Sequence, residues 1–409
     1  SSDLTQQAGS LAGLGILKQG TEGPDRFKDV PQAIIDQYKW DAFWDAPLYL
    51  DDKQVRVVGG PRKKEDITRA TANYAAQSCE VKTDGTRLMV SFPGVSLGMF
   101  AGRLQFTVFK GSNLIEQEVI AKTDRDNVAY LYNTGLKGLA IEPESRMVWQ
   151  TLANAPADNK FGGRKNDGEV TVKTANRILI AERGKAGSIA AFPPPHTYFW
   201  TRESPRNLGY NWYRKDSDTS FSFGIRQSEQ EDEDEYKGNF PLYNARPGTE
   251  QHMQAFFYAS AEPAEATRQA ALAFTHADRY KAIAGYKVMS HHFHTRFGLR
   301  LIEQNTADGE IDDFAALKAA GVDIVSPVDN YGGEGGRLWP AKGEDLKERQ
   351  FQIEGARRHS DKGFLVMSSN EVSPSPLGMH TDLLYSHPTY WLPRRAAGEP
   401  LVKIGRAHV

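Results

Sequence analysis

The chain has 409 residues, with 50 basic and 52 acidic side chains. It is too long for one ordinary core, and its near-zero net charge argues against a nucleic-acid partner. No apolar run approaches the roughly 20 residues that span a bilayer. The single cysteine, Cys79, excludes an internal disulfide.

Residues 1–30 are rich in Gly, Ser and Gln, and we expect them to form a lead-in segment. Residues 31–260 predict a large antiparallel β-sandwich. Apolar and polar side chains alternate in several runs separated by Gly, Asn and Asp turns, which is typical of half-buried strands. The clearest runs are residues 87–92, 104–108, 114–121, 170–172, 178–180 and 221–225.

The pattern changes after residue 260. Residues 261–280 show helical spacing and predict a linking helix between two domains. Residues 281–403 then alternate between strand and helix patterns, which predicts parallel strands with helices outside, as in a partial β/α barrel or an open sheet. We expect strands at 286–294, 322–329 and 364–369 and near 379–385, and helices at 311–320 and 344–359. The predicted fold class is therefore α+β and multidomain.

A histidine-rich segment ends the first of these strands. Side chains alternate faces in an extended strand, so His292 and His294 should share one face while His291 and Phe293 point the other way. Two imidazoles on one face can hold a metal ion. The alternative is a histidine cluster that only forms hydrogen bonds.

Further candidate ligands follow the later strands. Asp329 and Glu371 fall at expected carboxyl ends of strands, where α/β folds place their chemistry, and His380 could fold back into the same cleft. Asp329 could instead cap the turn that follows it. A divalent ion held there would lower the pKa of a water molecule and polarise a scissile bond. The sequence identifies no catalytic residue beyond these ligands.

Three residues are candidates for substrate binding. They are Asn330 beside Asp329, His387 before a proline, and Arg394, which could hold an anionic group. A structural role for His387 and a solvated Arg394 are the alternatives.

Together these motifs resemble the start of a PHP domain, the polymerase-and-histidinol-phosphatase family. His292 and His294 match its opening His-x-His strand, and residues 328–330 occupy the place of its Thr-Asp-His motif. Glu371 matches a strand-end glutamate, and residues 378–380 resemble its Gly-x-His segment. The resemblance implies a seven-stranded distorted β/α barrel that binds two or three zinc, manganese or iron ions and usually hydrolyses phosphoesters.

The chain departs from the family in two places. Asn330 replaces a histidine, and the later Asp-x-His motif is absent. Three hypotheses follow. The first is a metal-dependent hydrolase whose sandwich assists binding of a small-molecule or glycan substrate. The second is a non-catalytic carbohydrate-binding sandwich with a degenerate barrel. The third is an amidohydrolase-type metal enzyme, whose family also begins with His-x-His.

The last six residues, 404–409, look like the translation of a sequencing-adapter oligonucleotide. We therefore expect the natural sequence to diverge at about Lys403, and we expect a half-barrel fragment to aggregate and to be inactive. A sandwich before such a domain is similar to large bacterial metallohydrolases that are often exported. This indicates a periplasmic or secreted location without establishing it.

Overall fold

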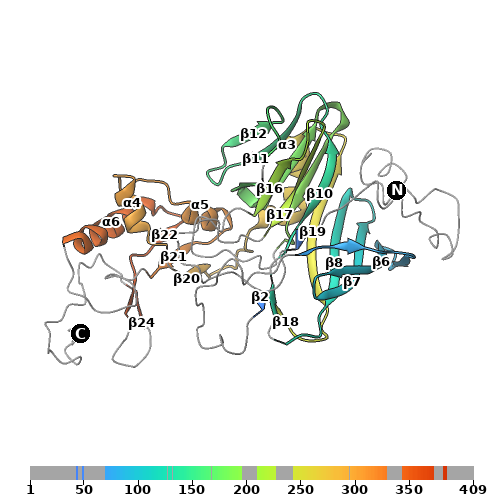
Figure 1. The fold of residues 1–409 in the computed structure, drawn as a ribbon. Helices are drawn as coiled ribbons and strands as arrows, with labels where there is room; N and C mark the ends of the chain where they lie inside the picture. The colour runs from blue at the N-terminus through green and yellow to red at the C-terminus, as the bar shows by residue number, and fades with distance from the viewer. Residues whose placement is uncertain are drawn as a thin grey trace. The chain divides into compact units, whose positions relative to one another are not determined.

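The protein was analysed as a computed structural model that divides into two units. The first unit contains Ser1–Thr201 and Arg206–Asp278, and the second contains Arg202–Pro205 and Arg279–Val409. Figure 1 shows the fold as a ribbon. The described residues are 43–44, 48–49, 70–126, 128–130, 132–166, 168–195, 210–226, 243–293, 295–328, 343–372 and 381–384.

The first unit is built on a ten-stranded antiparallel sheet. Nine of its strands have the order β12-β11-β14-β15-β19-β8-β7-β6-β4, and β5 also pairs with β6. The predicted runs at residues 87–92, 104–108 and 114–121 lie in these strands, and their antiparallel pairing is confirmed. Residues 114–121 are buried at every position rather than at every second one. Their bounds are β4 Asn73–Tyr74, β5 Glu80–Thr83, β6 Arg87–Leu97, β7 Phe100–Phe109, β8 Leu114–Lys122, β11 Ser145–Gln150, β12 Pro156–Lys160, β14 Leu179–Arg183, β15 Ser188–Phe192 and β19 Gln251–Ser260.

A four-stranded antiparallel sheet forms the second layer, in the order β10-β17-β16-β13. Its strands are β10 Asn133–Ala140, β13 Val170–Val172, β16 Asn211–Lys215 and β17 Ser220–Arg226. Strand β17 contacts β15 of the larger sheet, and β10 contacts β19. Large apolar side chains are fully buried in both sheets, among them Trp212, Phe221, Phe223 and Phe257. The first unit is therefore a β-sandwich.

Short elements complete the first unit. β1 Phe43–Trp44 pairs with β3 Ala70–Thr71, and β9 Val128–Tyr130 lies between β18 Tyr243–Ala245 and β2 Leu48–Tyr49. Among the described residues, the 3₁₀ helices of this unit are η3 Ala175–Arg177, η4 Gly184–Ala186 and η6 His276–Asp278.

Helix α3, Ala264–Thr275, lies within the predicted linking segment. It contacts β14, β15 and β19, and its buried Ala264 and Ala271 belong to a core cluster with Phe192 and Phe256 of the larger sheet. The helix therefore packs as an outer layer of the sandwich, and the division between the two units falls after it, at Asp278.

The second unit contains a three-stranded parallel sheet in the order β20-β21-β22. A cluster of buried apolar side chains from the strands and from all three helices forms its core, including Phe297, Phe314, Val325 and Ala356. The elements are β20 Met289–Phe293, α4 Phe297–Glu303, α5 Asp312–Ala319, β21 Ile324–Pro327, α6 Gly343–His359 and β22 Leu365–Val366. Alternating strands and helices were predicted here, but α4 was not.

The fourth predicted strand of this unit behaves differently from the first three. β24, Thr381–Leu383, pairs antiparallel with β23, Asn370–Val372, in a separate two-stranded sheet. A hairpin therefore follows the parallel sheet, and the described part of this unit contains no closed barrel. None of the helices among the described residues is both long enough and apolar enough to span a bilayer.

Candidate metal centre

Strand β20 contains an irregularity at its carboxyl end. His291 pairs with Ser326 of β21, and Phe293 pairs with the next residue of β21, Pro327. Strand β20 therefore has one extra residue between these two pairs. The extra residue, His292, has a φ of 60°, in the left-handed region that non-glycine residues rarely adopt. Pro327 has no N–H to donate to the ladder at this level. The segment is therefore a β-bulge centred on His292.

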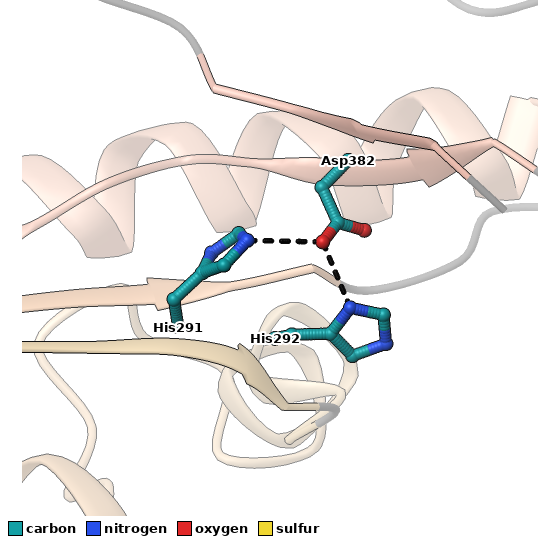
Figure 2. Close-up of side chains that lie close together, drawn as sticks. All are labelled: His291, His292 and Asp382. Atoms are coloured by element: carbon teal, nitrogen blue, oxygen red, sulfur yellow. Dashed lines mark hydrogen bonds and ion pairs between the residues drawn. The ribbon is translucent and has the colours of Figure 1, made fainter.

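The bulge brings two neighbouring histidines to one carboxylate, as Figure 2 shows. His292 Nδ1 lies 2.8 Å from Asp382 Oδ2, and His291 Nε2 lies 3.0 Å from the same oxygen. The prediction that His291 points away from His292 is therefore wrong, because strict alternation of faces requires a regular strand.

The three side chains meet the geometric requirement for sharing one ion. One ligand atom from each of His291, His292 and Asp382 lies within 4.8 Å of the others. The two imidazoles are part-exposed, with 37% and 46% of their side-chain surfaces accessible, whereas Asp382 retains 16%. The cluster is open to solvent on its histidine side and closed around the carboxylate.

Glu371 lies beside this cluster. It is the register partner of Asp382 in the β23–β24 hairpin and is only 6% exposed. Directly opposed residues of an antiparallel pair project from the same face, so both acidic side chains leave the same face of the hairpin, although the group of ligand atoms within 4.8 Å of one another does not include Glu371. Like charges in this position repel each other unless a cation or a proton compensates them.

Two observations fit a divalent cation. Imidazole nitrogens together with carboxylate oxygens are the donor set that zinc and similar metals take. The second oxygen of Asp382, Oδ1, is buried and has no hydrogen-bond partner among the described residues. A buried carboxylate oxygen usually has a partner, and an ion would supply one.

Most of the predicted ligands cannot be placed. His294, Asp329 and His380, and the predicted substrate-binding residues Asn330, His387 and Arg394, lie outside the described residues. Of the predicted ligands, the structure brings His292 into the cluster and sets Glu371 next to it.

Sequence reasoning missed His291 and Asp382. Asp382 lies inside an expected strand, between Thr381 and Leu383, whereas Glu371 was singled out because it follows the end of one. His291 was excluded by the assumption of a regular strand. The Ser326-Pro327 pair in the neighbouring strand was a sign that the ladder there could be irregular.

A second histidine–carboxylate pair lies on the larger sheet of the first unit. His252 Nδ1 is 2.7 Å from Glu118 Oε2, and Gln105 Nε2 donates to Glu118 Oε1 at 2.8 Å. Ser91 donates to Gln105, and Gln254 donates to Glu116 Oε1 at 2.6 Å. Burial, and then the neighbouring Glu118, raise the pKa of Glu116 to about 7. These side chains form a polar row across β6, β7, β8 and β19.

Comparisons with known proteins assign no family. No family model matches the chain, and no curated protein matches it. Among solved structures, it is similar to an α-N-acetylgalactosaminidase, NagBb, from Bifidobacterium bifidum, with 10% identity and a TM-score of 0.34, over 73% of this chain and 52% of that one. It is also similar to the GH36 α-galactosidase AgaA from Geobacillus stearothermophilus, with 10% identity and a TM-score of 0.31, over 86% and 44%.

A third solved structure has a different description. A TPR-domain containing protein from Parabacteroides distasonis matches at 9% identity and a TM-score of 0.29, over 74% of this chain and 57% of that one. The chain thus spans about half the length of the first two enzymes. At these TM-scores we draw no conclusion about function from the likenesses.

Proposed function

We propose that the second unit carries a divalent-metal site of a metal-dependent hydrolase, held by His291, His292 and Asp382 with Glu371 beside them. The observation that supports it is the meeting of two imidazoles from a bulged strand end with a carboxylate from a separate hairpin. His294, Asp329 and His380 remain candidates for further ligands. A bound zinc, manganese or iron ion would supply Lewis acidity and a water molecule of lowered pKa.

The side chains have distinct roles in this proposal. His291 Nε2 and His292 Nδ1 both face Asp382 Oδ2, so the two rings are already turned toward one point, where these nitrogens in their unprotonated form would coordinate the ion beside that oxygen. Glu371 adds negative charge next to that point, which favours a dication over a monovalent ion. The part-exposed histidine side leaves room for a substrate to approach.

Elemental analysis of the full chain tests the metal site. After dialysis against each metal in turn, the unmodified protein should retain zinc, manganese or iron, and the Asp382→Asn variant should retain much less. His252→Ala is the matched control, because it removes a histidine bonded to a carboxylate at a similar distance in the other unit. Retention of no metal by the unmodified chain, or equal retention by the Asp382→Asn variant, would contradict the proposal.

Phosphoesters are the substrate class we propose for this site, on the strength of the sequence resemblance to PHP domains. Metal-dependent release of nitrophenol from p-nitrophenyl phosphate would support it. If the full chain binds metal but neither hydrolyses a phosphate ester nor binds inorganic phosphate in a metal-dependent way, the metal site stands and the substrate class is wrong.

A second candidate function concerns the first unit, which we propose could bind a glycan. The polar row on β6, β7, β8 and β19 supports this, because carboxylates and amides in one row are suited to hydrogen bonding with sugar hydroxyls. A glycan array probed with the full chain and with its Gln105→Leu variant tests it. Binding that the variant loses is expected. Equal binding by both, or none, would contradict it.

A further inference from the structure

Among the described residues of the second unit, four polar side chains are completely buried. Ser326, Arg349, Gln352 and Ser369 each have 0% exposure. The hydroxyls of Ser326 and Ser369 are 2.8 Å apart, and Gln352 Nε2 donates to the Ser369 carbonyl at 3.3 Å. Arg349 Nη1 donates to Gln352 Oε1. One connected network therefore joins α6 and β21 to the segment that leads into β23.

Each arm of this network ends next to a residue of the metal centre. Ser326 is the register partner of His291 in the β20–β21 ladder. Ser369 precedes β23 and lies two residues before Glu371, whose partner in the hairpin is Asp382. The hydroxyl pair thus connects the strand beside His291 to the segment that leads into the carboxylate hairpin, in addition to the direct contacts of His291 and His292 with Asp382.

Packing alone does not explain these residues. The main core cluster of this unit consists of apolar side chains, among them Phe297, Leu301, Val325 and Val366 at 4% exposure or less. Burying a guanidinium and an amide costs free energy, and apolar residues of similar volume often stabilise a core at least as well. A satisfied polar network adds fixed geometry instead, because each hydrogen bond restricts the distance and direction of its partners.

We infer that Gln352, Arg349 and the Ser326–Ser369 hydroxyl pair are positioning residues for the metal centre. They set the separation between the strand end that carries His291 and His292 and the hairpin that carries Glu371 and Asp382. This inference rests on the proposed metal site. Removing such outer partners from a metal site typically weakens metal affinity by about 10–100-fold.

The experiment measures zinc affinity by calorimetric titration of the full chain. Ser326→Ala and Ser369→Ala each remove one hydroxyl, and Gln352→Leu removes the central amide. We expect the Kd for zinc to rise by about tenfold or more in each variant. The visible absorption of bound cobalt should also shift, because it reports ligand geometry and is insensitive to a uniform loss of stability.

Ser360→Ala is the matched control. Its hydroxyl donates to the Ala356 carbonyl at 2.7 Å and accepts from Val366 N at 2.9 Å, so it supports α6 and β22 without contacting the network. It should lower the melting temperature and leave the Kd unchanged. Folded network variants that bind zinc within twofold of the unmodified chain would overturn the inference. The inference would also be overturned if Ser360→Ala weakened zinc binding as much as the network variants do. A chain that binds no zinc before any substitution would instead overturn the metal site itself.

If Gln352→Leu fails to fold, the two serine variants still decide the question, since each deletes only one oxygen atom. The double variant adds a further check. Because the two hydroxyls bond to each other, removing both should raise the Kd by less than the product of the two single effects. Fully multiplicative effects would contradict a shared positioning role.

Discussion

Each unit contains a histidine bonded to a carboxylate, but the backbone beneath the two pairs differs. His252 and Glu118 lie on regular, paired strands, and the polar residues around them are distributed along a row. His292 and Asp382 lie on a bulge and on a separate hairpin, and a second histidine reaches the same oxygen. On regular strands, alternate side chains place polar groups along one face of the sheet. The bulge instead directs two neighbouring side chains toward the same carboxylate oxygen.

The largest predicted effect tests whether the two regions act separately. Trp212 is fully buried on the four-stranded sheet, and its Nε1 donates to the Ile225 carbonyl at 3.1 Å. Trp212→Ala should lower the free energy of unfolding of the sandwich by about 3–5 kcal/mol, because it leaves a large cavity. Denaturant unfolding followed by fluorescence measures the loss.

The zinc Kd of the same Trp212→Ala variant should stay unchanged, since every candidate ligand belongs to the second unit. A large loss of zinc affinity would show that the two regions are coupled.

The polar row should make the stability of the sandwich depend on pH. The pKa of Glu116 is raised from 4.5 to about 7, first by burial and then by Glu118. The folded state therefore holds this proton more tightly than the unfolded state, and the stability it contributes is present below pH 4.5 and lost as pH rises through 7. The full change is about 3 kcal/mol at most.

Glu116→Gln should remove this pH dependence, because an amide does not titrate. Gln254, His252 and Arg87 also act on Glu116, and all three remain in the variant. Unfolding free energies measured from pH 5 to pH 8 give the comparison. Parallel curves for the variant and the unmodified chain would contradict the raised pKa.

The smallest effect tests the bulge. His292 has a φ of 60°, which glycine adopts without strain and alanine does not. His292→Gly should therefore be more stable than His292→Ala by about 1 kcal/mol, although both lose the imidazole. At His291, whose φ is not positive, alanine should be the more stable of the two. If the same substitution, glycine or alanine, gave the more stable variant at both positions, the result would contradict the bulge.

Local patterns predicted much of the fold. Alternation in residues 87–92 predicted β6, and Gly321 after a run with Asp312 and Asp313 in its first turn predicted α5. These signals depend on neighbours in the chain, so one sequence is enough to read them. The helix α4 was missed because only seven residues form it, too few for a clear helical period.

The candidate site was predicted only in part. The alternation of side chains along β20 does not indicate that His292 is an extra residue in the ladder, because a bulge is defined by the pairing with the partner strand. The pairing of Asp382 with Glu371 is a contact between two strands, and the expected parallel strand near residue 381 concealed the hairpin. Arg349 and Gln352 lie on a helix of polar sequence, which gave no sign that their side chains are fully buried.

The most direct test of the central claim is a calorimetric titration of the full chain with zinc, beside the Asp382→Asn and His252→Ala variants. We predict saturable binding by the unmodified chain and by His252→Ala, and a Kd raised more than about tenfold in Asp382→Asn. Equal affinities in all three proteins, or no binding by the unmodified chain, would contradict the claim that His291, His292 and Asp382 hold an ion.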